Sequence, residues 1–293
     1  MAFKLYGNPP DRSIWDYVFT HELPAYHIWR NRHLGGNTTL SSLLQDKYLS
    51  NRKLGETRVP TVPVLAVLPR GSLFDPGCFL QKHPHLFCKP RHGSGGRDAF
   101  VISAHDQGGQ YTIFSTRNGV KEQISSLEII QDALSRDDFL VQPFMVNHHA
   151  LAELCGATEA VTVRVITEKH PRYGIRCYCA TLEIPINEDK AVFFHIMLPI
   201  NPNSGHVMPF PHGHLPNTAQ TRYDTLVARM GDFIVPYWAS LADSALKSHI
   251  IFPDVYAIAW DYVITPSGPY LLEGNTGWGT KTPQIILGGL IGE

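Results

Sequence analysis

The sequence lacks any long apolar segment, because no run of about 18 consecutive apolar residues, the length that can cross a bilayer, occurs in it. Its N-terminus, MAFKLYGNPPDRS, also lacks the apolar stretch that characterises a secretory signal peptide. We therefore expect a soluble, cytoplasmic protein that has no membrane partner.

Cysteine and net charge are low as well. The five cysteines are an odd number, and none of them forms a Cys-x-x-Cys pair. Cys177 and Cys179 lie two residues apart, which suits neither a zinc knuckle nor a redox pair, so we interpret the cysteines as thiols in a reducing cytosol. The formal net charge of -1 gives no broad electrostatic reason to bind nucleic acid, and we expect no such partner.

What the sequence does contain is typical of a globular protein: 43% hydrophobic and 17% charged residues in a chain of 293. Thr39 is expected to cap a helix that runs to Lys53. Residues 59–68 are apolar and rich in proline, which favours an edge strand. A long helix over residues 223–246 must be kinked or broken at Pro236.

The middle and the end of the chain alternate strands with a few helices. One helix is expected over residues 125–135, with Leu127, Ile130 and Leu134 on its apolar side. Many of the strands are joined as hairpins, which favours an α+β fold over a doubly wound parallel sheet. Strands are expected at residues 86–89, 99–104, 110–116, 139–144, 160–167, 175–185, 191–199, 255–264 and 270–273.

The most informative segment reads YAIAWDYVITPSGPYLLEGN. Its Pro-Ser-Gly tripeptide suits a three-residue hairpin loop centred on Ser267. Positions equidistant from Ser267 then face each other, so Asp261 directly opposes Glu273, with their Cβ atoms about 4.5–5.5 Å apart. Asn275 lies two residues beyond Glu273 and shares its face.

Two like charges that oppose each other in a hairpin destabilise it unless positive charge lies between them. The set of two carboxylates and one amide offers only oxygen ligands, which a hard cation prefers. Magnesium needs few protein oxygens, since phosphate oxygens and water complete its octahedron. The alternative is a solvated hairpin edge with incidental acids, but apolar neighbours such as Trp260 and Leu271 argue against full exposure.

A lysine followed by a glycine-rich loop forms the second candidate site. In LFCKPRHGSGGRDAF a short apolar strand ends at Lys89, and the loop contains Gly93, Ser94, Gly95 and Gly96. Such a loop lets backbone N–H groups turn inward around phosphate oxygens, and the lysine adds a positive charge for the same anion. The pattern is neither a Walker A motif nor a dinucleotide fingerprint, and a flexible hairpin loop is the alternative.

Together these segments resemble the ATP-grasp superfamily from about Asp46 to Gly279. They most resemble the group associated with sugar-transfer gene sets and, more distantly, D-alanine–D-alanine ligases. Asp46-Lys47 resembles an early pair whose lysine reaches the phosphates of ATP. Lys89 and the glycine loop resemble the second phosphate lysine and its mobile lid.

Three further motifs follow in the family's order. Residues 139–144 resemble the hinge strand that meets the adenine, which implies that Gln142, Pro143 and Phe144 lie near the base. Arg164, in Thr-Val-Arg-Val, resembles an arginine that faces the γ-phosphate. The third motif resembles the magnesium ligands of the family, which correspond to Asp261, Glu273 and Asn275.

The sequence also departs from the family. Where D-alanine–D-alanine ligases have an arginine, two residues before the first magnesium acid, this chain has Ala259, and Arg164 is our candidate to replace it. A buried structural salt bridge is the alternative for Arg164. The ribose-binding acid expected after the hinge is absent; His148 and His149 occupy that stretch, and His149 is our nucleotide-site candidate there.

The resemblance implies an ATP-grasp fold in which two α+β subdomains clamp ATP: an N-terminal region at 1–70, a lid with the glycine loop at 71–145, and a C-terminal subdomain with the magnesium site at 146–293. It implies an ATP-dependent ligase that joins a carboxylate to an amine through an acyl phosphate. The substrates could be amino acids. Lys89 and Arg164 are the catalytic candidates. A phosphotransferase without ligation and a non-catalytic nucleotide-binding protein are the alternatives.

Histidines gather around a loop rich in proline and asparagine at 200–220. They are His195, His206, His212 and His214. No cysteine or acid set accompanies them, so a transition-metal site is disfavoured. A loop that contacts substrate and a loop of solvated histidines remain as interpretations.

Overall fold

The structure is a computed structural model that describes residues 13–35, 38–93, 98–105, 110–115, 122–124, 127–157, 160–186, 194–210 and 217–291. The predictions for Ser94, Gly95, Gly96, His212 and His214 lie outside these ranges. Within them, no helix combines the length and the apolar character that crossing a membrane requires.

The larger of two sheets has five antiparallel strands in the order β11-β10-β7-β8-β9. Because side chains alternate between faces, Ile258 and Trp260 of the inner strand β10 enter one core while Ala257 and Ala259 enter another. This strand is therefore buried on both faces. The five strands are β7 (Thr162–His170), β8 (Gly174–Ile186), β9 (Phe194–Ile200), β10 (Ala257–Thr265) and β11 (Gly268–Asn275).

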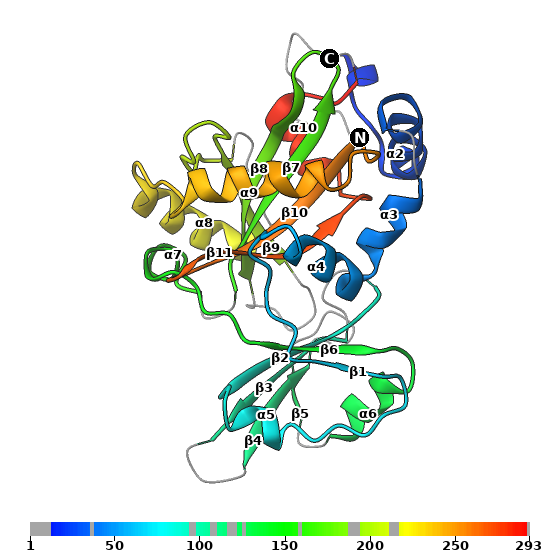
Figure 1. The fold of residues 1–293 in the computed structure, drawn as a ribbon. Coiled ribbons are helices and arrows are strands. Elements are labelled where there is room, and N and C mark those ends of the chain that lie inside the picture. Colours follow the sequence, from blue (N-terminus) through cyan, green and yellow to red (C-terminus); the bar gives the residue numbers. More distant parts are fainter. Residues whose placement is uncertain are drawn as a thin grey trace.

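Helices cover the two faces of this sheet (Figure 1). The first core is closed by α7 (His149–Cys155), α8 (Asn217–Met230) and α9 (Trp238–Ile250). On the other face, α2 (Leu23–Arg30) and α10 (Lys281–Leu287) cover one end of the sheet only, which leaves its other end to a cavity. Pro236 lies between α8 and α9, so the predicted break of the long helix is confirmed.

The smaller sheet has six strands in the order β1-β6-β2-β3-β4-β5 and a core of its own (Figure 1, lower part). Two helices, α5 (Gly77–Leu80) and α6 (Glu128–Leu134), accompany it. The predicted edge strand is confirmed, although it is limited to three residues. The strands are β1 (Ala66–Leu68), β2 (His85–Pro90), β3 (Phe100–Ala104), β4 (Tyr111–Ser115), β5 (Glu122–Ile124) and β6 (Phe139–Pro143).

The N-terminal part consists of short helices that pack on the larger sheet. The single helix expected from Thr39 to Lys53 is wrong: α3 (Thr38–Gln45) and α4 (Lys47–Gly55) are separate. Asp46 breaks the helix because its extended backbone and carboxylate cap α4, accepting hydrogen bonds from the N–H groups of Tyr48 and Leu49. The remaining short helices are η1 (Ile14–Asp16), η2 (Thr20–Glu22) and the π-helical η3 (Asn31–Gly35).

One extended segment connects the two sheets. Thr61 forms a parallel bridge to Leu271 at the free edge of β11, and the N–H of Leu271 donates to the carbonyl of Pro60. A few residues later the same segment becomes β1, at the edge of the smaller sheet. The chain thus fixes the edge of the strand that bears Glu273 before it enters the smaller sheet.

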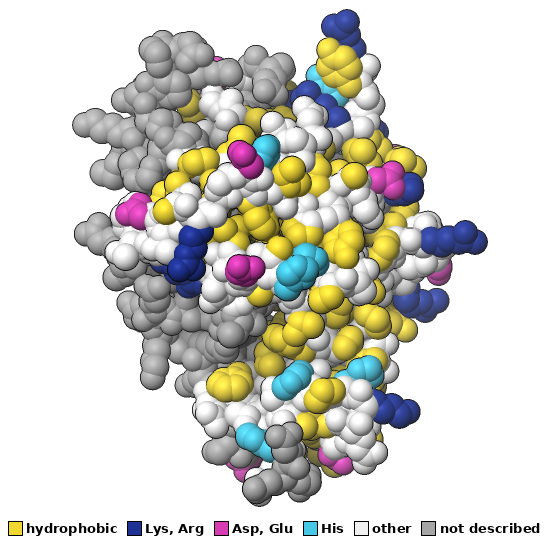
Figure 2. All heavy atoms as spheres, turned by 90° about the vertical axis from the view of Figure 1, so that its left-hand side faces the viewer, with side chains coloured by type: hydrophobic (Ala, Val, Ile, Leu, Met, Phe, Trp, Pro, Cys, Tyr) yellow, Lys and Arg dark blue, Asp and Glu magenta, His cyan; other side chains and the backbone are white. Residues whose placement is uncertain are grey.

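The face shown in Figure 2 is dominated by hydrophobic side chains near its centre, whereas most lysine and arginine side chains drawn in colour lie toward its rim. Val146, Ile234 and Tyr237 are among the large apolar side chains that are exposed in the described part of the chain. Scattered exposed apolar residues are normal on a protein surface and indicate no partner by themselves.

Candidate functional site

Three oxygen-bearing side chains converge at the open end of the larger sheet. Asp261 of β10 and Glu273 of β11 are directly opposed, as the sequence predicts, and Asn275 opposes Ala259 two positions further along the hairpin. The Asn275 Nδ2 atom donates to Asp261 Oδ2 at 3.1 Å and to Glu273 Oε1 at 3.3 Å. The amide therefore places the positive end of its dipole between the two carboxylates.

The predicted loop of this hairpin is wrong, although the predicted pairing of the acids is right. Thr265 pairs with Gly268, so the loop has two residues, and the Gly268 φ of +125° is a conformation that favours glycine. Pairing from that loop alone would place Asp261 opposite Leu272. A β-bulge at Leu272 inserts one extra residue, and the bulge restores the pairing of Asp261 with Glu273.

Arg164 binds the first of these acids instead of pointing freely into the cavity. It lies opposite Asp261 in the pairing of β7 with β10, and its Nε and Nη2 atoms meet Asp261 Oδ1 and Oδ2 at 2.7 and 3.0 Å. Its Nη1 atom lies 3.2 Å from Glu183 Oε1. The salt bridge weighed as an alternative role for Arg164 is thus present, and its catalytic role stays a prediction.

Burial and ion pairing shift the pKa values of Arg164 and of the two carboxylates that it contacts. Burial alone would lower the pKa of Arg164, but the charge and hydrogen bonds of Asp261, with Glu183 and Glu273, raise it. Burial raises the pKa of Asp261 against the opposing effect of Arg164. Burial likewise raises the pKa of Glu183 to about 7. Additional positive charge in the cavity would stabilise both carboxylates in their ionised forms.

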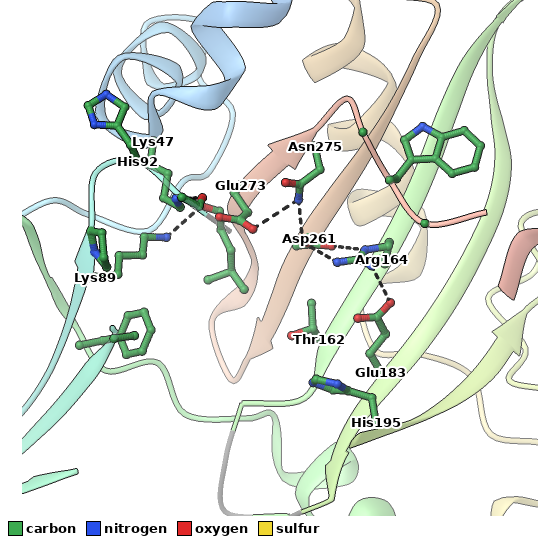
Figure 3. Close-up of a pocket in the computed structure, with 18 residues that line it drawn as sticks. Lys47, Lys89, His92, Thr162, Arg164, Glu183, His195, Asp261, Glu273 and Asn275 are labelled. Carbon is green, nitrogen blue, oxygen red and sulfur yellow. Dashed lines mark hydrogen bonds and ion pairs between the residues drawn. The ribbon is translucent and has the colours of Figure 1, made fainter. Parts of the chain in front are cut away.

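Two lysines approach from the opposite side of the cavity (Figure 3). Lys89, at the end of β2, is 8% exposed, and its Nζ atom lies 3.4 Å from the carbonyl oxygen of Leu272. Lys47, at the start of α4, donates from Nζ to the carbonyl of Gly93 at 2.6 Å. Burial lowers the pKa of both lysines, and the charge of Glu273 opposes that effect. An anion between them would favour their charged forms.

A clamp at the base of the glycine loop holds Lys47 in position. The cap residue Asp46 receives Nε and Nη2 of Arg91 at 2.7 to 3.0 Å, and the Nη1 atom of Arg91 reaches Asp138 at 3.1 Å. The N–H of Lys47 donates to the carbonyl of Arg91. The residue that caps α4 therefore also fixes the end of β2, from which the loop begins.

These groups surround one cavity of about 420 Å³ between the two sheets. Sequence reasoning missed Glu183 and Trp278, and it named His195 only as a member of the histidine cluster around residues 200–220. Glu183 had a detectable signal, because Thr181 and Glu183 are polar residues at alternate positions in the otherwise apolar second half of β8. The cavity is lined by Lys47, Phe87, Lys89, Pro90, His92, Gly93, Ala99, Thr162, Arg164, Glu183, His195, Asp261, Leu272, Glu273, Asn275, Gly277, Trp278 and Gly279.

The proposed adenine and ribose residues are not among these lining residues. The side chain of Gln142 is buried, and its Nε2 atom donates to the carbonyl of Val62 at 3.3 Å. Pro143 follows in β6, and the N–H of Phe144 donates to the carbonyl of His85. His149 is exposed and lies against His148, with ring centroids 4.2 Å apart. Contact of these residues with a nucleotide stays a prediction.

The donor set at Asp261, Glu273 and Asn275 fits magnesium. Its two carboxylates are hard oxygen ligands, and the Asn275 amide offers a third oxygen once it turns about its last torsion. In the described part of the chain, no three His, Cys, Asp or Glu side chains are grouped as a metal site. A magnesium site here would therefore depend on the amide and on oxygens supplied by a ligand.

Comparison with known proteins gives matches of two kinds. The family model described as sugar-transfer associated ATP-grasp matches residues 37–292. A solved D-alanine–D-alanine ligase from Bacillus anthracis is similar over 87% of this chain and 66% of its own, with 11% identity and a TM-score of 0.50.

A solved pyruvate carboxylase from Rhizobium etli is similar over 92% of this chain and 19% of its own, with 12% identity and a TM-score of 0.50. No curated protein matches the sequence. The chain thus spans less than two thirds of the length of these solved structures, and at such identities the likeness concerns the fold.

Proposed function

The chain belongs to the sugar-transfer associated ATP-grasp family, and from this premise we propose that it is an enzyme that uses ATP and Mg²⁺ to join a carboxylate to an amine. The observation that carries this proposal is the opposed pair Asp261 and Glu273, which shares one cavity with Lys89. A buried acid, a half-buried acid and a buried lysine in one cavity call for a ligand that brings both a cation and an anion. A magnesium nucleotide brings both.

The cavity offers suitable walls for the nucleotide. Phe87 and Leu272 contribute apolar surface on its lysine side, which suits a flat base. Lys47, Lys89 and the backbone at Gly93 are the candidates for the phosphate oxygens, because they combine positive charge with a loop that can turn its N–H groups inward. Gly93, with a φ of +94°, adopts a conformation that favours glycine.

Mg²⁺, held by Asp261, Glu273 and Asn275, would neutralise the charge of the terminal phosphates and orient them. The two lysines would neutralise the remaining phosphate charge. Arg164 would orient Asp261 through its two hydrogen bonds, so that the carboxylate presents its remaining lone pairs to the metal side.

The proposed reaction has two steps. An oxygen of the substrate carboxylate attacks the γ-phosphorus in line, the bond from phosphorus to the bridging oxygen breaks, and ADP leaves. An amine that arrives as an ammonium ion first loses one proton to water, and its neutral nitrogen then attacks the acyl carbon. Phosphate leaves with the acyl oxygen, and the nitrogen loses one further proton to the departing phosphate as the amide forms. An acyl phosphate is hydrolysed by water, so the cavity must close during the reaction.

We assign that closure to the smaller sheet, which the sequence places in the lid at 71–145. β1 belongs to the same sheet, which supports a lid that begins a few residues before Ala66. The contacts of Arg91 with Asp46 and Asp138, and of Lys47 with Gly93, join the base of the glycine loop to α4. Small movements of the lid would therefore be transmitted to a phosphate ligand.

The test is an assay of ATP turnover with Mg²⁺ over amino acids and small carboxylic acids, in which hydroxylamine serves as the amine and mass spectrometry detects the hydroxamate. Glu273→Gln is expected to lower turnover by at least about 100-fold, because a metal ligand is lost. Glu153→Gln, which changes an exposed acid on α7, is the matched control and should retain the activity.

The outcomes separate the alternatives. Full magnesium-dependent turnover by Glu273→Gln would contradict the metal assignment. A stable phosphorylated product without hydroxamate would identify a phosphotransferase. Binding of ATP without formation of ADP over the whole panel would identify a non-catalytic nucleotide-binding protein.

A further inference from the structure

The end of the cavity that lies away from the lysines has its own chemistry. Glu183 of β8 pairs with Met197 of β9, and His195 lies two residues before Met197, so the two polar side chains share one face of the sheet. Thr162 of β7 pairs with Glu183 from the other side. Figure 3 shows Glu183 and His195 together beyond Arg164, on the side opposite to Lys89.

Charge at this end favours a cation. The Glu183 side chain is 8% exposed and meets Arg164 through a single contact of 3.2 Å. The Nε and Nη2 atoms of Arg164 are engaged by Asp261, so this arginine offers little to a second anion. Burial, with the nearby charge of Arg164, lowers the pKa of His195 to about 4, and its imidazole is therefore neutral near pH 7.

A carboxylate bound at this end would meet the charge of Glu183 across a buried cavity, with Arg164 already committed to two acids. An ammonium group would instead complete an alternating row of acid, arginine, acid and ammonium, in which each buried charge has an opposite neighbour. The ring of His195, which is neutral near pH 7, does not repel such a group, whereas a protonated ring would.

We propose that Glu183 and His195 form the subsite for the amine substrate, which Glu183 recognises as a primary ammonium ion. This inference rests on the proposed function and assigns the nucleotide and the amine to different places. The nucleotide phosphates lie between the lysines and the metal residues, and the amine enters from the side of β8 and β9. Glu183 is then a specificity-determining residue that sequence reasoning did not single out.

A purely structural role for Glu183, as a second partner that holds Arg164, is the rival explanation. It predicts that removing the charge disturbs Arg164 and through it Asp261, so that binding of the magnesium nucleotide weakens. The ammonium subsite predicts the reverse pattern, in which binding of a small cation is lost while binding of the nucleotide is retained.

The experiment titrates the full-length protein with ethylammonium, acetate and ethanol, three probes of similar size and different charge, and detects binding by saturation-transfer NMR. The titrations are made with and without Mg²⁺ and a non-hydrolysable ATP analogue. The wild type is expected to bind ethylammonium in preference to acetate and ethanol. This comparison uses the wild type alone, so it tests the proposal even if a substitution at Glu183 prevents folding.

Two variants then locate the site. Glu183→Gln should weaken ethylammonium binding by at least about tenfold, while its affinity for the nucleotide analogue stays within about threefold of the wild type. Glu183→Asp keeps the charge and should lose less of its affinity for ethylammonium than Glu183→Gln. The control Glu153→Gln should bind ethylammonium as the wild type does. Preference of the wild type for acetate, absence of ethylammonium binding, or equal binding by Glu183→Gln would each overturn the proposal.

Failure of this inference is distinguishable from failure of the proposed function. Hydroxylamine is uncharged near neutral pH, so hydroxamate formation by the wild type does not need an ammonium site. Absence of hydroxamate in the wild type counts against the ligase, whereas the NMR titration judges the subsite by itself.

Discussion

At the scale of single residues, the cavity balances three carboxylates against three cations. They are Asp261, Glu273, Glu183, Arg164, Lys47 and Lys89. A nucleoside triphosphate would add several negative charges to this balanced set, and magnesium is the compensation that the oxygen ligands allow. Binding of nucleotide and metal should therefore depend strongly on each other.

Lys89 allows a residue-scale prediction about function and stability together. Burial lowers its pKa, so the folded protein holds its charge at a cost that a neutral side chain avoids. The variant Lys89→Met should unfold at an equal or higher urea concentration than the wild type near neutral pH. It should bind the magnesium nucleotide at least about tenfold more weakly, since a charged contact to phosphate is lost.

The sign of this effect on stability follows from proton linkage. A lysine whose pKa is depressed in the folded state binds fewer protons there than in the unfolded chain, so its unfavourable contribution is present at neutral pH and fades as pH rises toward its usual value. Lys53→Met on the exposed face of α4 is the control for both measurements. Nucleotide affinity unchanged by Lys89→Met in a calorimetric titration would remove Lys89 from the phosphate site.

At the scale of elements, the hairpin of β10 and β11 shows what the sequence can and cannot predict. Alternation of side chains places Asp261 on the same face as Ala259, and this much is local. The bulge at Leu272 depends on how β11 is held by Pro60 and Thr61, which are about 200 residues away in sequence and whose pairing no local pattern reveals. The predicted pairing of the acids is correct, although the loop length on which that prediction is based is wrong.

Prediction from the sequence fails at other parts of the site for a similar reason. The partners of Arg164 follow from the position of β7 between β10 and β8, and this strand order is a property of the whole fold. The break at Asp46 was missed because the apolar pattern continues through it, whereas the capping carboxylate and its pair with Arg91 favour a new helix. Helix and strand existence is predicted well where periodicity is long, as in α8 and β8.

The turn after β9, in which Gly205 packs against the start of α9, provides the element-scale prediction. A Cβ atom on Gly205 would lie 2.3 Å from Cγ of Trp238, the first residue of α9, and the φ of +77° is strained for any L side chain. Gly205→Ala should therefore destabilise the protein by about 3 kcal/mol or more, from clash and backbone strain together. Gly174→Ala has a similar φ of +71° with no atom within 4 Å and should cost only about 1–2 kcal/mol.

Urea unfolding measures both variants. Because the two glycines share their backbone conformation, the difference between them isolates the contact with the indole ring. Equal destabilisation by the two substitutions would show that Trp238 moves aside without cost, and that the start of α9 is not fixed by this contact.

At the scale of the whole molecule, two sheets with separate cores are joined by two crossings of the chain. The smaller sheet has its own apolar cluster, which includes Ile102, and the larger sheet has another, which includes Leu198. We propose that the smaller sheet is a cooperative unit that opens by itself, as a lid requires.

The corresponding prediction uses one core residue from each sheet. Ile102→Ala should destabilise the smaller sheet by about 2–5 kcal/mol and speed amide exchange in β2, β3 and β6, with little change in β7 and β10. Leu198→Ala is the reciprocal substitution and should speed exchange in β8 and β10. Hydrogen exchange with mass spectrometry gives both patterns, and a uniform increase over both sheets would mean that they unfold as one unit.

The bulge at Leu272 has a consequence for how related sequences can vary in length. A turn shortened or extended by one residue would move Asp261 and Glu273 to opposite sides of the ribbon, unless the irregularity beside them vanished at the same time. Insertions in this turn should therefore occur together with the loss of the extra residue, as paired changes. We expect a sequence in which only one of the two lengths has changed to lack the opposed pair of acids that the proposed metal site needs.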